Sequence, residues 1–477
     1  MPDPAPAHIH WFRRDLRLSD NPALLAASHS GAPLIPLYIL SDWRESHPWT
    51  GPGRQQFLCD CLASLDEDLR ALGSRLILRQ GSPLEVLARL GEEYPVRAIH
   101  FHHDPDPYGK KVEAQLQEFC QEQGWACEGH DGVALHRFAE TCKDDGTAYR
   151  VYTPYSKRWL ALEKPAPDRK PASLSTPGAL SSLPLPALES WQLSLPAQAE
   201  LLPGGEAAAR QRLRQALADR LPAYAEKRDH PAVAATSRLS QDLRWGTLSI
   251  REVFAHAQQA QEAASSPSEG ESFNKFIKEL AWRDFYFHLL EAFPDVLQHE
   301  FNPAYRGLPW AEPGEQFAAW KEGRTGFPIV DAGMRELQAT GFMHNRVRMI
   351  TAMFLTKDLH LDWRLGEQHF AQHLLDGEIA SNNGGWQWSA GTGADAAPYF
   401  RIQNPWTQSK RFDAEGDYIK KWVPELAAVA PKELHQAPDL VSGHGRDYLA
   451  PIVDHAAERE KTLTLFKNHL AAKRGEA

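Results

Sequence analysis

The chain has 477 residues, of which 42% are hydrophobic and 24% charged, and its formal net charge is −10. This composition is typical of a soluble globular protein of two or three domains. It contains no run of about 20 apolar residues, which excludes a membrane-spanning helix. The acidic total argues against non-specific coating of nucleic acid, although it allows one local basic patch.

The five cysteines all lie in the first third of the chain, and they form no CxxC pair and no metal-ligand spacing. Reduced cytosolic thiols explain them most simply. Residues 1–17 lack the apolar core of a secretory signal. We therefore expect a protein of the bacterial cytoplasm, with no metal site and no membrane partner.

The first 135 residues alternate short apolar runs with amphipathic helical patterns. Strands are predicted at 8–12, 34–40, 75–79 and 98–102, and helices at 54–72, 83–93 and 109–124. Such alternation predicts an α/β domain with a parallel, doubly wound sheet, whose ligands bind beyond the carboxyl ends of the strands. The segment WFRRDLR at 11–17 follows the first strand, and we interpret it as a buried Arg–Asp pair that fixes the loop. No GxGxxG or P-loop motif follows that strand.

Residues 136–205 are predicted to be a long interdomain linker, because 164–203 is rich in Pro, Ser, Ala and Leu and carries little charge. Helical patterns dominate from residue 206 to 477. The clearest are at 206–227, 272–293, 328–340, 345–360 and 363–375. The sequence therefore predicts an α/β domain, a linker and a large all-α domain.

A cluster of hydroxyl groups, Thr236 to Ser240, precedes a predicted helix and surrounds one arginine. Such a run can bind a pyrophosphate through hydroxyl and free backbone N–H groups. An ordinary helix N-cap explains the same residues, and on residue types alone it is the favoured alternative.

One predicted helix carries an acid, a tryptophan, an arginine and a tyrosine on a single face, since Glu279, Trp282, Arg283 and Tyr286 recur at helical spacing. A purely structural helix would bury Leu or Ile there, so this face indicates a site. In the segment HNRVRM, Arg346 and Arg348 point to different sides of a second helix.

The segment 376–405 combines two acids, small residues, Trp386, Trp388 and Arg401. Small residues let a planar ligand approach the backbone, tryptophan offers flat faces for stacking, and arginine offers a charge for phosphate. Asp376 and Glu378 can pair with an inward arginine such as Arg348. The alternative is a Gly-rich loop that caps a helix and buries both tryptophans in the core.

Five motifs together resemble the cryptochrome/photolyase family: WFRRDLRLSDNPAL, TSRLS, ELAWRDFY, TGFPIVDAGMRELQATGFMHNRVRM and DGEIASNNGGWQW. They occur in the family's order and cover nearly the whole chain. The resemblance is greatest to class I cyclobutane pyrimidine dimer photolyases, which are light-driven DNA repair flavoproteins. It implies that the helical domain holds FAD. It also implies that light-excited, reduced FAD passes an electron to a flipped-out dimer and splits it.

The resemblance assigns residues to three tasks. The FAD-binding residues would be Tyr224, Thr236, Ser237, Arg238, Leu239, Ser240, Phe276, Glu279, Arg283, Arg348, Asp376, Glu378 and Asn382. The residues that contact the dimer and its flanking phosphates would be Arg228, Glu279, Trp282, Asn345, Arg346, Met349, Trp388, Arg401 and Lys410. Trp386, Trp363 and Trp310 match the family's electron-transfer chain, and Asn382 matches the amide that photolyases place beside the flavin ring.

An antenna chromophore in the N-terminal domain is also implied. Arg54, Asp104, Asp106 and Arg244 resemble an 8-hydroxy-5-deazaflavin pocket more than a methenyltetrahydrofolate pocket. We expect a monomer whose partner is UV-damaged DNA. The alternative is a cryptochrome-like blue-light photoreceptor without repair activity. The residues His344 and Asn345, with Met349 where a second histidine would stand, argue against repair of (6-4) photoproducts.

Overall fold

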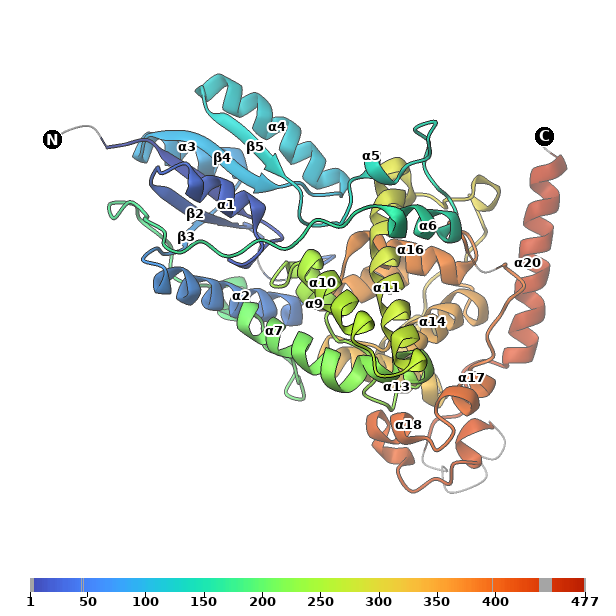
Figure 1. The fold of residues 1–477 in the computed structure, drawn as a ribbon. Coiled ribbons are helices and arrows are strands. Elements are labelled where there is room, and N and C mark those ends of the chain that lie inside the picture. The colour runs from blue at the N-terminus through green and yellow to red at the C-terminus, as the bar shows by residue number, and fades with distance from the viewer. Residues whose placement is uncertain (1–3, 44, 46, 397, 437–447, 476–477) are drawn as a thin grey trace.

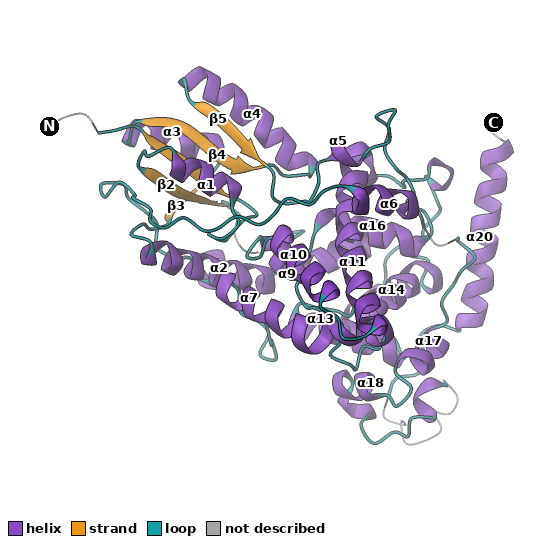
Figure 2. Cartoon of the chain, viewed as in Figure 1, coloured by secondary structure: helices purple, strands orange, loops and turns teal. Residues whose placement is uncertain are grey.

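The computed structural model describes residues 4–43, 45, 47–396, 398–436 and 448–475. An α/β domain at the N-terminus packs against a larger helical domain (Figure 1). All five named strands belong to the first domain, and helices joined by loops form the remainder of the described chain (Figure 2). This is the fold class predicted from the sequence. Among the described residues, no helix combines the length and the apolar character needed to cross a membrane.

The sheet is fully parallel, with the strand order β3-β2-β1-β4-β5. Its strands are β1 (Ala7–Phe12), β2 (Leu34–Leu40), β3 (Ile77–Gln80), β4 (Val96–His102) and β5 (Ala126–His130). The first four were predicted. β5 was not predicted, because its sequence ACEGH contains no apolar run. The strand lies at the edge of the sheet and has no fully buried residue.

The order of the strands reverses between β1 and β4, so a crevice is expected beyond the carboxyl ends of these two strands. The helices of this domain are α1 (Pro22–His29), α2 (Pro52–Ala71), α3 (Pro83–Glu93) and α4 (Pro107–Gln123). Side chains of α1 and α2 share a core with one face of the sheet, and those of α3 and α4 share a core with the other. The three predicted helices are confirmed, whereas α1 was missed because it is short.

The predicted linker packs closely against the rest of the protein. It contains the helices α5 (Phe138–Thr141) and α6 (Tyr152–Ala161) and the 3-10 turn η1 (Leu188–Trp191). Beyond α6 it follows the N-terminal domain, and the backbone N–H groups of Leu174 and Leu183 donate to Leu72 and Leu78. Buried Trp191 anchors it in the core beneath α2. The exact divisions at residues 135 and 205 stay predictions.

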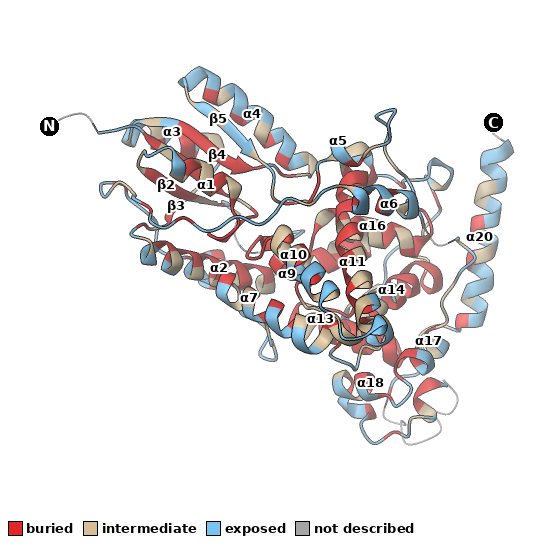
Figure 3. Cartoon of the chain, viewed as in Figure 1, coloured by how far each residue is buried: buried red, intermediate tan, exposed pale blue. Residues whose placement is uncertain are grey.

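The helical domain is built around α11 (Pro267–Ala292), which packs against α6, α10 and α16. Its other regular elements are α7 (Glu206–Gln215), η2 (Ala216–Arg220), η3 (Leu221–Ala223), α8 (Tyr224–Lys227), α9 (Ser240–Trp245), α10 (Ile250–Glu262), η4 (Pro294–Leu297), η5 (Pro303–Tyr305), α12 (Glu315–Glu322), α13 (Pro328–Thr340), α14 (Asn345–Met353), η6 (Phe354–Asp358), α15 (Trp363–His373), α16 (Ile379–Ala390), α17 (Pro405–Phe412), α18 (Asp417–Trp422), η7 (Pro424–Leu426), η8 (Glu433–His435) and α20 (His455–Gly475). Figure 3 shows α11, α14 and α16 largely buried at the centre, with α7 and α20 more exposed at the periphery.

Local chemistry explains where these helices begin and break. α11 begins at Pro267 because the Ser266 side chain accepts the N–H of Glu269 and proline fits the first turn. The helix predicted at 206–227 is divided into α7, η2, η3 and α8. Pro222 lacks the backbone N–H that a continuous helix would need there.

Candidate functional site

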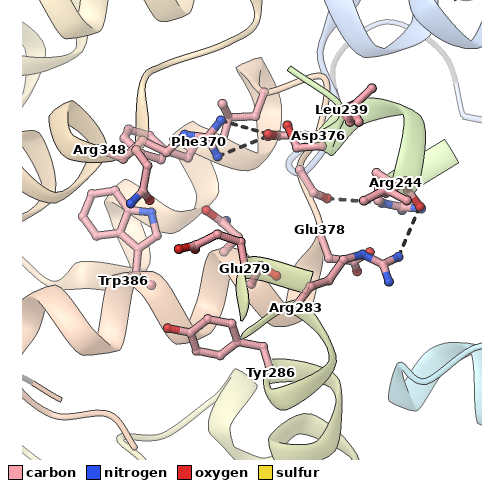
Figure 4. A pocket seen from close by; sticks show the side chains of 18 of the residues that line it. Leu239, Arg244, Glu279, Arg283, Tyr286, Arg348, Phe370, Asp376, Glu378 and Trp386 are labelled. Atoms are coloured by element: carbon pink, nitrogen blue, oxygen red, sulfur yellow. Dashed lines mark hydrogen bonds and ion pairs between the residues drawn. The ribbon is translucent and has the colours of Figure 1, made fainter. Parts of the chain in front are cut away.

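A cavity of about 320 Å³ lies inside the helical domain, lined by residues of α9, α11, α14, α15 and α16 (Figure 4). We call it the central cavity. Of the residues assigned to FAD, the lesion or electron transfer, those that line it are Ser237, Leu239, Ser240, Phe276, Glu279, Arg283, Asn345, Arg348, Met349, Asp376, Glu378, Asn382 and Trp386. Motifs that are far apart in the sequence therefore meet at one place.

Arg348 and Asp376 form a two-pronged ion pair at one end of the central cavity (Figure 4). The guanidinium nitrogens lie 3.2 and 2.9 Å from the two carboxylate oxygens. Burial alone would raise the pKa of Asp376, but the Arg348 guanidinium, helped by Ser240 and Arg238, holds that pKa below its ordinary value. The cavity therefore presents a fixed charge pair beside any bound ring.

Glu378 connects the cavity to the N-terminal domain, because its carboxylate pairs with Arg14. Arg14 also donates to Asp104 at 2.8 Å, at the crevice where β1 and β4 end. The buried Arg–Asp pair expected to fix the loop at residues 11–17 is formed by Arg14 with a partner outside this segment, Asp104. Asp15 instead accepts the backbone N–H of Arg13 and lies 3.0 Å from His10. Arg14 serves as an interdomain bridge because its two acid partners come from distant segments.

Helix α11 contributes Glu279, Arg283 and Tyr286 to the cavity wall, whereas Trp282 lies outside the lining. Arg283 is held by the carbonyl oxygens of Val133 and Leu243. A Cβ on Gly384 would lie 2.1 Å from the Tyr286 ring, so glycine is required for α16 to approach α11 this closely. A Cβ on the next residue, Gly385, would meet no atom within 4 Å, since it faces the open cavity.

Two arginines beside the cavity form ion pairs with acidic side chains. Arg228 pairs with Glu279, which lines the cavity, and Arg346 donates to Asp229 at 2.8 Å. The side chains of Arg228 and Arg346 are 35% and 19% exposed, so both remain accessible to a ligand.

The remaining predicted residues lie outside the lining. Trp282 stacks on Tyr152, with ring centroids 3.7 Å apart and an interplanar angle of 7°. Trp388 is half-buried, and Arg401 and Lys410 are exposed. On the cofactor side, the Tyr224 ring packs edge-on against Phe276, Thr236 is half-buried, and the Arg238 guanidinium covers the Phe342 ring at 3.6 Å. The N-cap explanation of the Thr236–Ser240 run is not realised, because α9 has no side-chain cap.

Comparison with known proteins identifies the family. Residues 8–172 match the DNA photolyase family model, and residues 276–468 match the model for the FAD-binding domain of DNA photolyase. A Synechococcus deoxyribodipyrimidine photo-lyase is 38% identical over 97% of this chain and 97% of its own length. The chain belongs to the cryptochrome/photolyase family.

Solved structures agree with this assignment. A bacterial class III photolyase from Agrobacterium tumefaciens superimposes with a TM-score of 0.90 at 37% identity and covers 98% of each chain. A Synechocystis cryptochrome superimposes with a TM-score of 0.89 at 30% identity, over 98% of this chain and all of its own. The narrower assignment to class I stays a prediction.

The residues of the central cavity fit the FAD of this family. The Oε1 atom of Glu378 and the indole N–H of Trp386 are buried at the cavity without a hydrogen-bond partner in the protein. Buried polar atoms are normally satisfied, so these two point to a polar ligand. With the Arg348–Asp376 pair and the open face at Gly385, they form a cradle for a planar polar group.

The three tryptophans assigned to electron transfer share one hydrophobic core. Trp386 and Trp363 are 2% and 0% exposed, and half-buried Trp310 packs against the same core. The Trp386 ring lies against α15 at Gly366. Trp320, which the sequence did not single out, has its ring 6.1 Å from Trp386. Nothing in its local pattern distinguished it from a core tryptophan.

The four residues assigned to an antenna chromophore lie near the interdomain boundary. Arg54 and Arg244 both approach the Trp245 ring, and Arg244 also lines the central cavity. Burial and the neighbouring Arg244 lower the pKa of Arg54 to about 9. Asp104 bonds Arg14, and the Asp106 carboxylate accepts the N–H of Gly109 to cap α4. Arg244 is thus shared between the two predicted sites.

Proposed function

We propose that this protein is a light-dependent DNA repair enzyme that splits cyclobutane pyrimidine dimers, a deoxyribodipyrimidine photo-lyase. The observation that carries the proposal is the central cavity, which collects the dimer- and cofactor-binding motifs beside an accessible pair of arginines. Relatives named deoxyribodipyrimidine photo-lyase, which match nearly the full chain, support the same activity.

FAD, when bound, supplies light-driven electron transfer to the dimer. The residues that would hold it are those of the cavity lining, with Thr236 to Ser240 and Tyr224 beside them. Arg348 keeps Asp376 ionised at the cavity wall. Asn382 donates its side-chain N–H to the carbonyl oxygen of Glu367 at 2.9 Å. The Asn382 amide has no acidic proton, so it presents a neutral dipole to the cavity. An aspartic acid at the same position could release a proton there.

The lesion must leave the duplex to reach a buried cavity. Glu279 and Met349 line the cavity where the dimer would be received, and Trp282 and Trp388 would flank it. Burial raises the pKa of Glu279, while Arg228 opposes that rise. When DNA binds, phosphate groups can take over Arg228 and release the Glu279 carboxyl for a pyrimidine edge.

The rim would hold the DNA backbone through Arg228, Arg346, Arg401 and Lys410. Arg228 and Arg346 are ion-paired but partly exposed, and Arg401 and Lys410 are exposed. All four are therefore accessible to phosphates. Binding through such contacts weakens as salt concentration rises.

The decisive experiment uses purified protein loaded with reduced FAD and an oligonucleotide that contains one cyclobutane dimer. Under blue light we expect the dimer absorbance to revert to that of two thymines, with no reaction in the dark. Dimers that remain intact under illumination contradict the proposal. A (6-4) photoproduct in the same sequence should remain unrepaired.

A photoreceptor without repair is the second candidate, because the Synechocystis neighbour is a cryptochrome. It predicts a light-driven spectral change but no preference for damaged over undamaged DNA. The accessible arginines beside the cavity favour repair. We expect a monomer by gel filtration and a cytoplasmic location.

An antenna chromophore of the 8-hydroxy-5-deazaflavin type, rather than methenyltetrahydrofolate, is our proposal for the N-terminal domain. The cluster of Arg54, Arg244 and Asp104 at the interdomain boundary supports it. A related archaeal photolyase from Sulfolobus tokodaii carries two FAD molecules and implicates a novel light-harvesting cofactor. Extraction of the bound chromophores and their absorption spectra test the assignment.

A further inference from the structure

A second pocket, of about 410 Å³, lies between the two domains and is distinct from the central cavity. We call it the donor pocket. The residues that matter for its chemistry are Trp49, Trp310, Glu312, Asp362, Arg364 and Glu367. Its volume is within the range of small-molecule sites. It shares no lining residue with the central cavity, so a molecule bound here would not compete with a lesion.

Two tryptophans from different domains line the donor pocket. Trp49 comes from a loop of the N-terminal domain and is 43% exposed, which is unusual for so large an apolar side chain. The backbone of this loop is anchored, because Arg54 donates to the Trp49 carbonyl oxygen at 3.0 Å and Gln372 of α15 donates to that of His47. The other tryptophan, Trp310, is the outermost member of the proposed electron chain.

The polar groups of the donor pocket make it unfavourable for anions. The lining includes three acidic residues, Glu312, Asp362 and Glu367, and one arginine. The guanidinium of this arginine, Arg364, is already engaged by Glu300, Asp362 and the carbonyl oxygen of Gln298. No free cation therefore remains among these lining residues to hold a phosphate. A neutral or cationic ring is favoured, since tryptophan faces attract cations and the Glu312 carboxylate adds to that attraction.

We propose that the donor pocket binds a flat nitrogen-heterocyclic reductant without negative charge, of the dihydronicotinamide or dihydroflavin class, which restores Trp310 after it has lost an electron. The proposal deepens the proposed function, since it rests on Trp310 being the outer end of the chain. In the step, one electron passes from the donor ring to the oxidised Trp310 indole. Trp310 is reduced, the donor is oxidised by one electron, and the donor then releases a proton to water.

The first test measures binding in the dark and needs no electron transfer. The probe is the 1-methylnicotinamide cation, followed by quenching of tryptophan fluorescence and by saturation-transfer NMR. We expect saturable binding that Trp49→Ala weakens by about tenfold or more, equivalent to roughly 1.4 kcal/mol. Glu312→Lys should weaken it as well, because it reverses one of the pocket's charges. Nicotinamide mononucleotide, which carries a negatively charged ribose phosphate on the ring nitrogen in place of the methyl group, should bind more weakly.

The matched control is Tyr108→Ala, which removes another exposed aromatic ring, 71% exposed, at the start of α4. It should leave binding unchanged. Absence of saturable binding, or equal binding by wild type and Trp49→Ala, overturns the proposal. Trp49 is an exposed loop residue whose backbone carbonyl makes the anchoring contact, so its truncation should not prevent folding.

The second test follows the tryptophan radical after a blue flash, with 1-methyl-1,4-dihydronicotinamide as the donor. Re-reduction should reach a plateau with donor concentration in wild type and become slower and linear in Trp49→Ala. Identical kinetics in the two proteins overturn the donor role even if the dark probe binds. If wild type forms no tryptophan radical, the electron chain of the proposed function fails, while the dark measurement still decides whether the pocket binds the ring.

Discussion

The central cavity and the donor pocket are both lined by tryptophan and arginine, yet their charges are arranged differently. In the central cavity Arg348 and Asp376 pair with each other, and one polar atom each of Glu378 and Trp386 has no partner in the protein. In the donor pocket the single arginine is fully engaged and carboxyl groups are in excess. The first arrangement suits a polar cofactor and a DNA lesion, and the second suits an uncharged or cationic ring.

The two sites are joined through α15 and α16. Trp363 and Glu367 belong to α15, while Asn382 and Trp386 belong to α16. Asn383 donates to the Glu367 carboxyl at 3.0 Å, and Asn382 donates to the Glu367 backbone oxygen. A substitution in α15 or α16 at one site can therefore be tested for its effect on the other site.

The largest effect is expected from Arg348→Ala, which should damage the central cavity alone. Removing the guanidinium leaves the buried Asp376 carboxylate unpaired, which costs about 3–5 kcal/mol. We expect loss of FAD from the purified protein, measured by absorbance, and a lower free energy of unfolding in urea. Retention of normal FAD content would contradict the assigned role of the pair.

The control for that experiment is Arg335→Ala, which breaks an ion pair to Glu425 of similar length outside both sites. Because that pair is partly exposed, its loss should cost no more than about 1 kcal/mol. FAD content should be unchanged.

The pH dependence of stability should identify Glu367, which lies between the two sites. Burial raises its pKa from 4.5 to about 7, so the folded state holds an extra proton between these pH values. The resulting stabilisation is fully present below pH 4.5 and is lost as pH rises through 7, roughly 3 kcal/mol in total. Glu367→Gln cannot ionise, so its urea midpoint should change less between pH 5 and pH 8. Parallel pH profiles for the two proteins would refute the shift.

The connection between the sites is tested by Trp363→Phe. It should slow light-driven reduction of the protein by on the order of tenfold, equivalent to about 1.4 kcal/mol in barrier height. Repair by chemically reduced protein should be spared, because the lesion side does not use this route. The control is Trp320→Phe, whose ring also adjoins Trp386. If only the Trp320 variant is slow, the electron path runs through Trp320 instead.

The smallest effect is expected at the rim. Arg346→Gln should weaken binding of dimer-containing DNA by roughly 1 kcal/mol and reduce the salt slope by about 1. Binding of 1-methylnicotinamide in the donor pocket should not change. Arg324→Gln, at a residue that pairs with Glu322 on the surface, is the control and should leave the slope unaltered. An unchanged slope in the Arg346 variant would remove this residue from the phosphate contacts.

Much of the fold follows from local patterns. Four of the five strands and the three main helices of the first domain are readable because apolar periodicity is a local property. β5 and α1 were missed because β5 has no fully buried residue and α1 is short, so neither leaves such a pattern. The break in the helix predicted at 206–227 could have been placed from Pro222.

The contacts of the site also divide into those that were predicted from the sequence and those that were not. The pairing of Arg348 with Asp376 was predicted from motif and resemblance, and the structure confirms the contact. The partner of Glu378 was not predictable, because Arg14 lies 364 positions away and belongs to another domain. The Trp282–Tyr152 stack and the Trp386–Trp320 contact were missed because the two rings of each pair come from segments far apart in the sequence.

The sequence alone determined the family, the two-domain architecture and the residue types that face the central cavity, because these depend on motifs and on helical or strand periodicity. Only the tertiary structure decided which charges are paired, that Arg14 bridges the domains, and that Trp49 and Trp310 line one pocket. The physical reason is that an ion pair or a pocket depends on distances between segments, and those distances are set by the packing of whole helices and sheets.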